Sequence, residues 1–214
     1  MKKKINLPDI IPIFPLSNFI FFPKTTVPLN IFEERYLNMI DDTMKKKDRL
    51  IGMIQPQNNQ TSSKNLYEVG CVGKITSFNE TDDGRYLIAL SGVNRFKIIK
   101  EIESDKLYRE CKISYNDFYS DQEENEEKIS FNDLEPLFRK LKNYFSKQGL
   151  VINWKELEKQ DLEFSLNTLS MAAPFSLEEK QALIESQNLR SRQKIIENIL
   201  ETYILDEFNN NTIQ

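Results

Sequence analysis

The chain has 214 residues, of which 39% are hydrophobic and 29% charged, a composition typical of a soluble globular protein with a buried core. Its net charge of −4 argues against a nucleic-acid-binding protein, because phosphate contacts need Lys and Arg gathered on one face. The sequence contains no histidine, which excludes Ser-His-Asp and Cys-His catalysis and an ordinary zinc site.

The N-terminal segment, MKKKINLPDIIPIFPL, begins like a secretory signal peptide because three lysines precede apolar residues. Asp9 and the prolines at positions 8, 12 and 15 interrupt the apolar run, and no small-residue cleavage site follows. Nowhere does the sequence approach the roughly 18 uninterrupted apolar residues of a membrane span. Two cysteines, Cys71 and Cys111, are too few for a disulfide framework, and we interpret them as buried thiols. The protein is therefore expected in the cytoplasm.

Short apolar runs separated by prolines predict three β-strands near the start of the chain, over residues 10–14, 19–22 and 27–31. Proline within or beside a strand indicates an edge position, a strand end or a bulge. We therefore expect a bent, partly closed sheet, with the phenylalanine-rich run 19–22 buried in its core.

The spacing of the apolar residues then changes, and residues 32–47 are predicted to form a helix. Its apolar stripe is Phe32, Tyr36, Ile40 and Met44, spaced four residues apart. Acidic residues open this helix and the lysine run 45–47 closes it, as the helix dipole favours. We interpret the lysine run as a helix end and not as a basic binding patch.

Alternating apolar and polar residues predict further strands after the helix. Gly70 and Gly73 indicate a bulge or bend within one of them, and Asp83-Gly84 indicates a tight hairpin turn. Ser91-Gly92 is interpreted as a second turn. These elements predict a small barrel-like or two-sheet β domain. The expected strands cover residues 50–54, 67–78, 85–90, 93–100 and 107–119.

The second part of the chain is predicted to be a helical bundle. Residues 121–127, DQEENEE, are an acidic linker, so we place a domain boundary near residue 122, with a β domain over 1–121 and helices over 122–214. The final NNNTIQ is expected to fray. Helical stripes and caps are expected around residues 134–149, 153–157, 162–173, 176–183 and 192–207.

A search for catalytic and cofactor motifs finds no GxxxxGK[ST], GxGxxG or HExxH. The adjacent carboxylates Asp41-Asp42 and Asp82-Asp83 are interpreted as surface residues of a helix and a turn. Trp154 could stack on a ligand, but a lone tryptophan in a bundle is more often a core anchor. We therefore predict no catalytic residue, no cofactor and no metal, and the binding residues are left unassigned.

Four segments resemble the N-terminal substrate-binding domain family of Lon protease. The first, FPLSNFIFFPKTTVPLNIFEERYLNMIDDTM, carries its Pro-Leu, Phe-Pro, Pro-Leu and Arg-Tyr steps, ending at Arg35-Tyr36. The others are LYEVGCVG from Leu66, the GxxRF pattern from Gly92 to Phe96, and FSLEEKQALIESQNLRSR over residues 175–192. Together they cover nearly the whole chain in the family's order.

The resemblance implies an α+β fold, in which a PUA-like small β-barrel or two-sheet domain with one inserted helix precedes a C-terminal helical bundle. In that family the region helps to select protein substrates for an attached ATPase and a Ser-Lys peptidase. No residue here matches the catalytic serine or lysine. The resemblance therefore implies a stand-alone, bacterial-type, non-enzymatic module that binds polypeptide segments or a partner protein.

Other functions stay open at this point. The chain could be an adaptor or regulator of a protease acting in trans. RNA binding through a PUA-like domain is opposed by the acidic composition, and a cryptic hydrolase has no motif to support it. We expect the binding site at the junction of the two domains, where clefts form preferentially.

Overall fold

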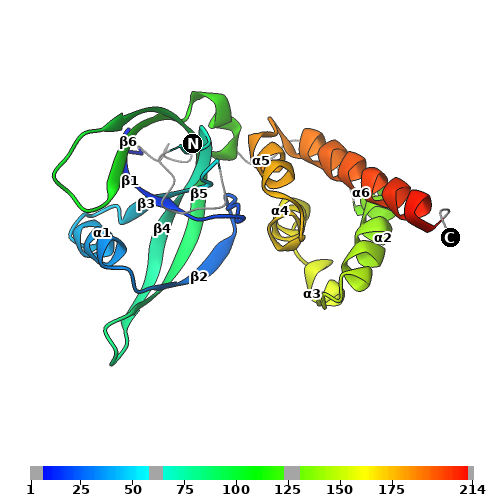
Figure 1. Cartoon of the computed structure of the whole chain (residues 1–214), viewed down its shortest axis with the longest axis horizontal. Coiled ribbons are helices and arrows are strands. Elements are labelled where there is room, and N and C mark those ends of the chain that lie inside the picture. Colours follow the sequence, from blue (N-terminus) through cyan, green and yellow to red (C-terminus); the bar gives the residue numbers. More distant parts are fainter. Residues whose placement is uncertain (1–6, 58–64, 123–130, 212–214) are drawn as a thin grey trace. The chain divides into compact units, whose positions relative to one another are not determined.

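The computed structural model describes residues 7–57, 65–122 and 131–211 of the chain, with side chains over 134–205 in the last range. The chain divides into two compact units, Met1–Glu124 and Asn125–Gln214, and each is described by itself (Figure 1). Among the described residues, no helix has the length and apolarity needed to cross a bilayer. Most of the expected acidic linker and the last three residues lie outside the described ranges.

In its described residues the first unit contains a six-stranded sheet with one α-helix and one 3-10 helix, and the described part of the second unit is helical. This mixed α+β architecture confirms the predicted fold class at that level. The strands are ordered β2-β5-β4-β3-β1-β6 in the sheet. The elements of the first unit are β1 (Ile10–Pro15), β2 (Thr26–Ile31), α1 (Glu34–Met44), β3 (Leu50–Ile54), β4 (Val69–Glu80), β5 (Tyr86–Ile102), β6 (Arg109–Ser114) and η1 (Asn116–Gln122).

The sheet returns on itself through β5. Strand β6 pairs antiparallel with β1 and also with β5, so the pairings β5-β4-β3-β1-β6 close into a ring. The first part of β5 lies between β2 and β4, whereas its last part, from Lys97 onward, pairs with β6. Strand β2 lies outside the ring and pairs with β5. In Figure 1 the β4–β5 hairpin extends beyond the other strands.

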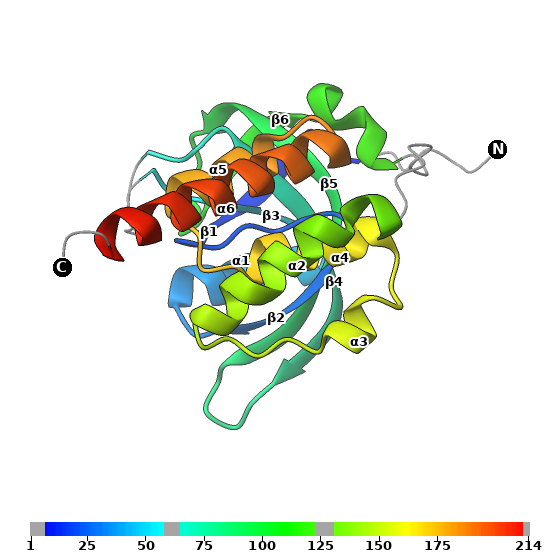
Figure 2. The ribbon, with the colours of Figure 1, turned by 90° about the vertical axis from the view of Figure 1, so that its right-hand side faces the viewer.

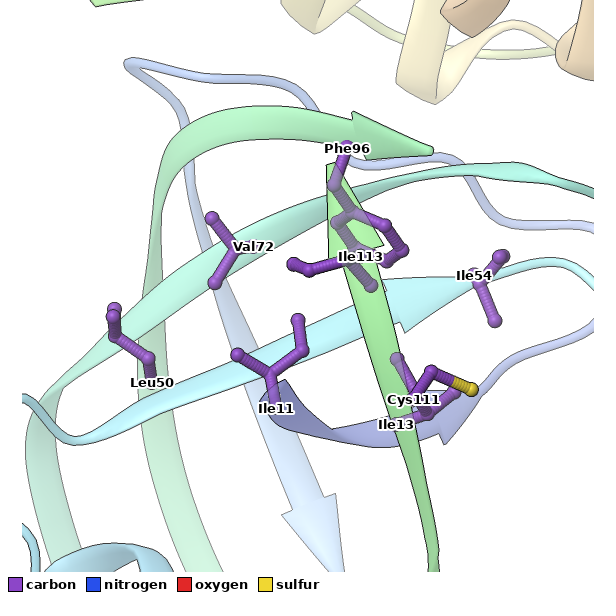
Figure 3. Packing of buried hydrophobic residues seen from close by; sticks show 8 residues of the cluster. All are labelled: Ile11, Ile13, Leu50, Ile54, Val72, Phe96, Cys111 and Ile113. Carbon is purple, nitrogen blue, oxygen red and sulfur yellow. The ribbon is translucent and has the colours of Figure 1, made fainter. Parts of the chain in front are cut away.

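The core of the first unit lies inside this ring. All five of its strands contribute buried apolar side chains, which converge in Figure 3. Burial of this kind is the main driving force for the fold. Cys111 belongs to this cluster, so the prediction of a buried thiol is confirmed there. The cluster consists of Ile11, Ile13, Leu50, Ile54, Val72, Phe96, Cys111 and Ile113.

Helix α1 packs on the strand that opens the chain. The rings of Tyr36 and Phe14 meet edge-on with their centroids 4.6 Å apart. Tyr36 and Ile40 are buried as predicted. Phe32, however, precedes the helix and is 63% exposed, so its assignment to the apolar stripe was wrong. The chain is still leaving β2 at Phe32, and the helix begins only after Glu33.

The path of residues 16–25 corrects one predicted strand and one predicted turn. The run 19–22 is not a strand, although Phe21 and Phe22 are buried as expected. Ser91-Gly92 is not a turn, because β5 continues through it. A Cβ atom on Gly92 would lie 2.0 Å from the Phe22 carbonyl oxygen, so this glycine permits the close crossing of a neighbouring segment. The predicted Gly84 turn is confirmed, with φ of 76°.

The last predicted strand of the first unit is shorter than expected. Residues 107–119 were predicted as one strand, but β6 ends at Ser114 and the chain continues into η1. Phe118 in η1 is buried, and its carbonyl oxygen accepts a hydrogen bond of 3.2 Å from the Asn94 side chain. The Asn94 side chain on β5 thus binds the backbone of η1, a contact that the alternation of apolar and polar residues in the sequence does not predict.

The second unit is built from amphipathic helices with the expected caps. Asn153 caps α3, and Ser176 and Glu179 form the reciprocal capping box that the sequence predicts for α5. Figure 2 shows α6 as one continuous helix. The helices are α2 (Phe131–Lys147), α3 (Trp154–Leu157), α4 (Leu162–Ala172), α5 (Leu177–Glu185) and α6 (Leu189–Asn211).

A buried arginine joins three helices of this unit. Arg192 of α6 is 3% exposed and donates from Nε to the Leu183 carbonyl oxygen of α5 at 3.3 Å. The same nitrogen donates to the Ser186 hydroxyl at 3.2 Å. Its Nη1 donates to the Asn167 side chain of α4. Burial of the guanidinium is therefore compensated by acceptors on several helices.

Candidate functional site

Residues of the GxxRF segment have structural roles. Gly92 allows the crossing at Phe22, and Phe96 lies in the core cluster. The Arg95 guanidinium, 2% exposed, donates to both carboxylate oxygens of Asp121, with Nη2–Oδ1 at 2.8 Å and Nε–Oδ2 at 3.0 Å. This pair holds η1 against β5, so the segment builds the scaffold and supplies no reactive group.

The other family-like segments are also structural. Arg35 forms an ion pair with Glu33 at 2.7 Å and lies over the Tyr36 ring. A Cβ on Gly70 would lie 2.4 Å from the Met53 carbonyl oxygen, which explains the glycine in LYEVGCVG. In the helical segment, Arg192 forms the buried cluster described above. These motifs specify a fold, and the binding surface has to be sought elsewhere.

The adjacent carboxylates of the sequence make contacts that fix their positions, and those of Asp41 and Asp42 accept hydrogen bonds from tyrosines. Tyr86 donates to Asp41 at 2.9 Å, and Tyr108 donates to Asp42 at 2.8 Å. The hydrogen bond from Tyr108 is the main reason that the pKa of Asp42 lies below its ordinary value. Asp83 forms an ion pair with Arg85 in the hairpin turn. These contacts fix α1 and the turn, which supports their interpretation as structural residues.

The cysteines and the tryptophan are likewise part of the packing. Cys71 and Cys111 are free and buried, and burial raises the pKa of Cys111 to about 11. Burial also raises the pKa of Cys71, so neither thiol resembles an activated nucleophile. Trp154 packs edge-on against Phe145. Within the described ranges, no group of three His, Cys, Asp or Glu side chains could hold a metal ion.

A face of the sheet is left exposed where β2, β5 and β4 lie side by side. Val27, Ile88 and Leu90 point inward and are buried, so the residues between them point outward. The pairings place these residues in rows across the three strands, one of them Asn30–Leu87–Asn79. We call this the outer face. It consists of Thr26, Pro28, Asn30, Thr76, Ser77, Asn79, Leu87, Ala89 and Ser91.

None of these residues is charged, although 29% of the residues of the chain are charged, but the row Thr26–Ser91 continues on β4 to the exposed Lys74. All of its residues are exposed or half-buried, and Leu87 is 43% exposed. The hydroxyl groups of Thr26 and Thr76 both bond to that of Ser91, at 2.9 and 3.3 Å. Depletion of charge is typical of the centre of a protein interface. The outer face is therefore our candidate binding surface.

Phe32 extends the outer face beyond the end of β2. Its position continues the outward alternation of Thr26, Pro28 and Asn30. The Arg85 guanidinium lies over its ring, 5.6 Å from the centroid, at the hairpin end of the face. Lys74, which pairs with Ser91, marks the opposite end. A neutral, partly apolar surface thus lies between two basic residues.

The outer face was missed in the sequence because it depends on strand register. The segment TVPLNI lies far in the chain from ITSFNE and YLIALS, and only strand pairing brings the neutral residues of all three together. One available signal was the absence of charge at alternate positions in all three. The prediction of a site at the junction of the two units stays a prediction.

Comparisons with known proteins agree with the scaffold. The family model described as "ATP-dependent protease La (LON) substrate-binding domain" matches residues 10–202. The Lon protease of Malacoplasma penetrans is 30% identical over an alignment that covers 93% of this chain and 26% of that protein. The Lon protease of Cytophaga hutchinsonii is 26% identical, over 85% of this chain and 23% of that protein.

Solved structures show the same fold. The crystal structure of a Lon N-terminal domain protein from Xanthomonas campestris covers 90% of this chain and 97% of its own, with a TM-score of 0.63 and 18% identity. The N-terminal domain of Lon protease from the Mycobacterium avium complex covers 90% of this chain, with a TM-score of 0.59 and 12% identity. This chain spans about a quarter of the length of the curated Lon proteases. Because the family model accounts for residues 10–202, the chain belongs to the Lon substrate-binding domain family.

Proposed function

We propose that this chain binds segments of other polypeptides and performs no catalysis on them. The match to a substrate-binding domain over residues 10–202 is the observation that carries this proposal. The buried thiols and the tyrosine-held carboxylates support the non-enzymatic part, since none of them is arranged as a nucleophile with a base. The partner is a polypeptide segment or a protein that presents one.

The outer face is the surface that we assign to this binding. Leu87 and Phe32 offer apolar contact area, and the hydroxyl and amide groups around them can bond to a polypeptide backbone. A folded domain usually covers its surface with charge, so an unfolded segment with exposed apolar groups fits this face better.

The finer architecture belongs to the same proposal. We infer that the closed ring of strands is a small barrel of the PUA-like type, because each ring strand has two partners. We also infer that residues 1–121 and 122–214 are two domains of one Lon N-terminal-like region. A cytoplasmic location fits the two free cysteines.

Binding of an unfolded protein tests the function directly. Fluorescein-labelled, reduced and carboxymethylated α-lactalbumin is titrated with the chain and followed by fluorescence anisotropy, with native α-lactalbumin as the folded comparison. We expect binding of the unfolded form alone. Absence of binding to the unfolded form would contradict the proposal.

The location is tested with matched substitutions. Leu87→Ser is expected to raise the Kd about tenfold, since about 1.5 kcal/mol of apolar contact is lost. Leu107→Ser is the control, because Leu107 is 60% exposed in the loop between β5 and β6 and is not part of the outer face. An equal rise in Kd for both variants would show that binding does not depend on the outer face.

RNA binding is the alternative that the same assay can reject. A labelled single-stranded RNA replaces the protein probe at low and at moderate salt. The net charge of −4 predicts no retention. Tight, salt-sensitive binding would replace the polypeptide proposal.

A further inference from the structure

The sheet of the first unit has several segments with an unpaired edge among the described residues, and two of them border the outer face. One is β2, whose pairings are all with β5. The other is the part of β4 beyond Lys74, where the pairing with β3 has ended. An unpaired edge presents backbone N–H and C=O groups that can pair with another strand. The two edges differ in how they are protected.

The edge of β4 carries two features that oppose pairing with another strand. The register shifts between Ile75 and Ser77, which is a bulge, and Glu80 places a charge near the end of the strand. Both features are ordinary protections of an edge. Strand β2, TVPLNI, has neither a bulge nor a charge. Its single protective residue is Pro28.

The backbone direction of β2 identifies the groups on its free edge. The Gly92 amide donates to the Thr25 carbonyl oxygen at 2.8 Å, so Thr25 faces β5. By alternation the backbone N–H and C=O groups of Val27, Leu29 and Ile31 point toward β5. The backbone groups of Thr26, Pro28 and Asn30 point away from β5, toward the free edge. This direction agrees with Pro28, which has no N–H to give to a partner strand.

The outward groups are available to a binding partner. They are the N–H groups of Thr26 and Asn30 and the carbonyl groups of Thr26, Pro28 and Asn30. Within the described parts of the chain, these backbone groups make no hydrogen bond to another segment. The side chains of all three residues are exposed.

We infer that a bound polypeptide adds to the free edge of β2 as an extended, uncharged strand. The inference rests on the proposed function and specifies its binding mode. The row of main-chain groups selects an extended backbone as the occupant. The side chains of β2 are all neutral and select a segment without charge along this strand, because a charged side chain there would be desolvated without a partner on β2.

Pro28 limits the strength of this pairing. It removes one donor from the middle of the edge while its carbonyl oxygen still accepts. The occupant therefore leaves one carbonyl group unpaired and binds reversibly. The same missing donor disfavours continuous pairing between two copies of this chain.

The experiment uses two peptides and two variants of the full chain. The first probe is a fluorescein-labelled nine-residue peptide of alternating Val and Ser with a polyethylene-glycol tail. The second has the same sequence with methyl groups on all of its inner backbone nitrogens, which blocks strand pairing at both edges and leaves the side chains unchanged. Asn30→Pro removes an outward N–H of β2, and Asn30→Ala is the matched control that keeps it.

We expect the unmethylated peptide to bind and the methylated peptide to bind at least tenfold more weakly. Asn30→Pro is expected to raise the Kd about fivefold relative to Asn30→Ala, the effect of about one backbone hydrogen bond, since both variants lack the Asn30 side-chain amide. Amide exchange at Thr26 and Asn30 is expected to slow at least tenfold with the peptide bound. Exchange in the unbound Asn30→Pro variant also shows whether β2 remains paired with β5.

Other outcomes separate this inference from the proposed function. If unfolded α-lactalbumin binds but methylation and Asn30→Pro leave the affinities unchanged, binding occurs without strand addition and the inference is overturned. The same holds if the amides of Thr26 and Asn30 are already protected in a dimer detected by sedimentation, since a second copy then occupies the edge. If no probe binds, the proposed function fails as well.

Discussion

Each of the two units buries an arginine, and the two arginines are satisfied in different ways. Arg95 of the first unit is bound by one carboxylate, that of Asp121, and lies over the Phe118 ring at 4.4 Å. Arg192 of the second unit donates to a backbone carbonyl, a hydroxyl and a side-chain amide. Among these contacts, Arg95 has a charged acceptor, whereas the acceptors of Arg192 are neutral groups on other helices and at a helix end.

The difference indicates how each unit responds to substitution. Removing the carboxylate of a buried ion pair takes away the opposite charge that compensates the guanidinium. Removing an arginine from a set of neutral acceptors leaves several smaller deficits, some of which water can fill. We therefore expect the first unit to be the more sensitive at its arginine cluster.

The largest effect is expected for Asp121→Ala. It should lower the free energy of unfolding of the first unit by about 3–5 kcal/mol, because the Arg95 guanidinium stays buried without the carboxylate of Asp121. Urea unfolding followed by circular dichroism measures the change. The double variant Arg95→Met with Asp121→Leu should recover at least half of the loss. A double variant as unstable as Asp121→Ala would show that packing of η1, and not charge, dominates.

Arg192→Met is expected to have a smaller effect, about 2–3 kcal/mol, on the second unit. The fluorescence of Trp154, the only tryptophan, reports the unfolding of this unit separately. Arg190→Met is the matched control on the same helix, because Arg190 is exposed. A loss for Arg192→Met as large as that for Asp121→Ala would remove the contrast between the two clusters.

Alkaline pH should destabilise the first unit by up to about 2 kcal/mol between pH 10 and 12. Burial, together with the hydrogen bond to Asp42, raises the pKa of Tyr108 to about 12. The unfolded chain then loses this proton at lower pH than the folded chain, so stability is full below pH 10 and falls as the pH rises toward 12. Tyr108→Phe should flatten this fall. An unchanged pH profile in that variant would assign the loss to other groups.

The smallest effect is expected for Ser176→Ala, about 1 kcal/mol on the second unit. The Ser176 hydroxyl accepts from the Glu179 amide at 3.2 Å, and the Glu179 carboxylate accepts from the Ser176 amide at 2.7 Å. Thermal unfolding followed by Trp154 fluorescence measures the change. Ser146→Ala, an exposed serine in α2, should leave the transition unchanged within error.

The sequence predicts best those elements whose limits are set locally. Strand β3 was predicted at its observed bounds, because five apolar residues are closed by polar residues and Pro56. The Ser176 cap and the Gly84 turn were also correct, since each depends on a few neighbouring residues. The resemblance of four segments to the Lon substrate-binding domain family then predicted the fold to which these elements belong.

The errors occur where a distant segment decides the structure. Ser91-Gly92 resembles a turn, but the glycine is needed where the Phe22 carbonyl oxygen crosses β5. Phe32 fits a helical stripe by spacing, although it belongs to the exposed end of β2. The outer face could not be predicted, because it exists only in the register of three strands.

The ion pair between β5 and η1 also determines where the chain can be divided. Asp121 is separated from Arg95 by 26 residues and lies near the end of the first unit. A truncated fragment that stops at residue 120 would keep every strand and still lose the carboxylate that pairs with the buried Arg95 guanidinium. Fragments intended for isolated study of the strands should therefore extend through Gln122, and the acidic side chain just before that end is as necessary to them as any residue of the apolar core.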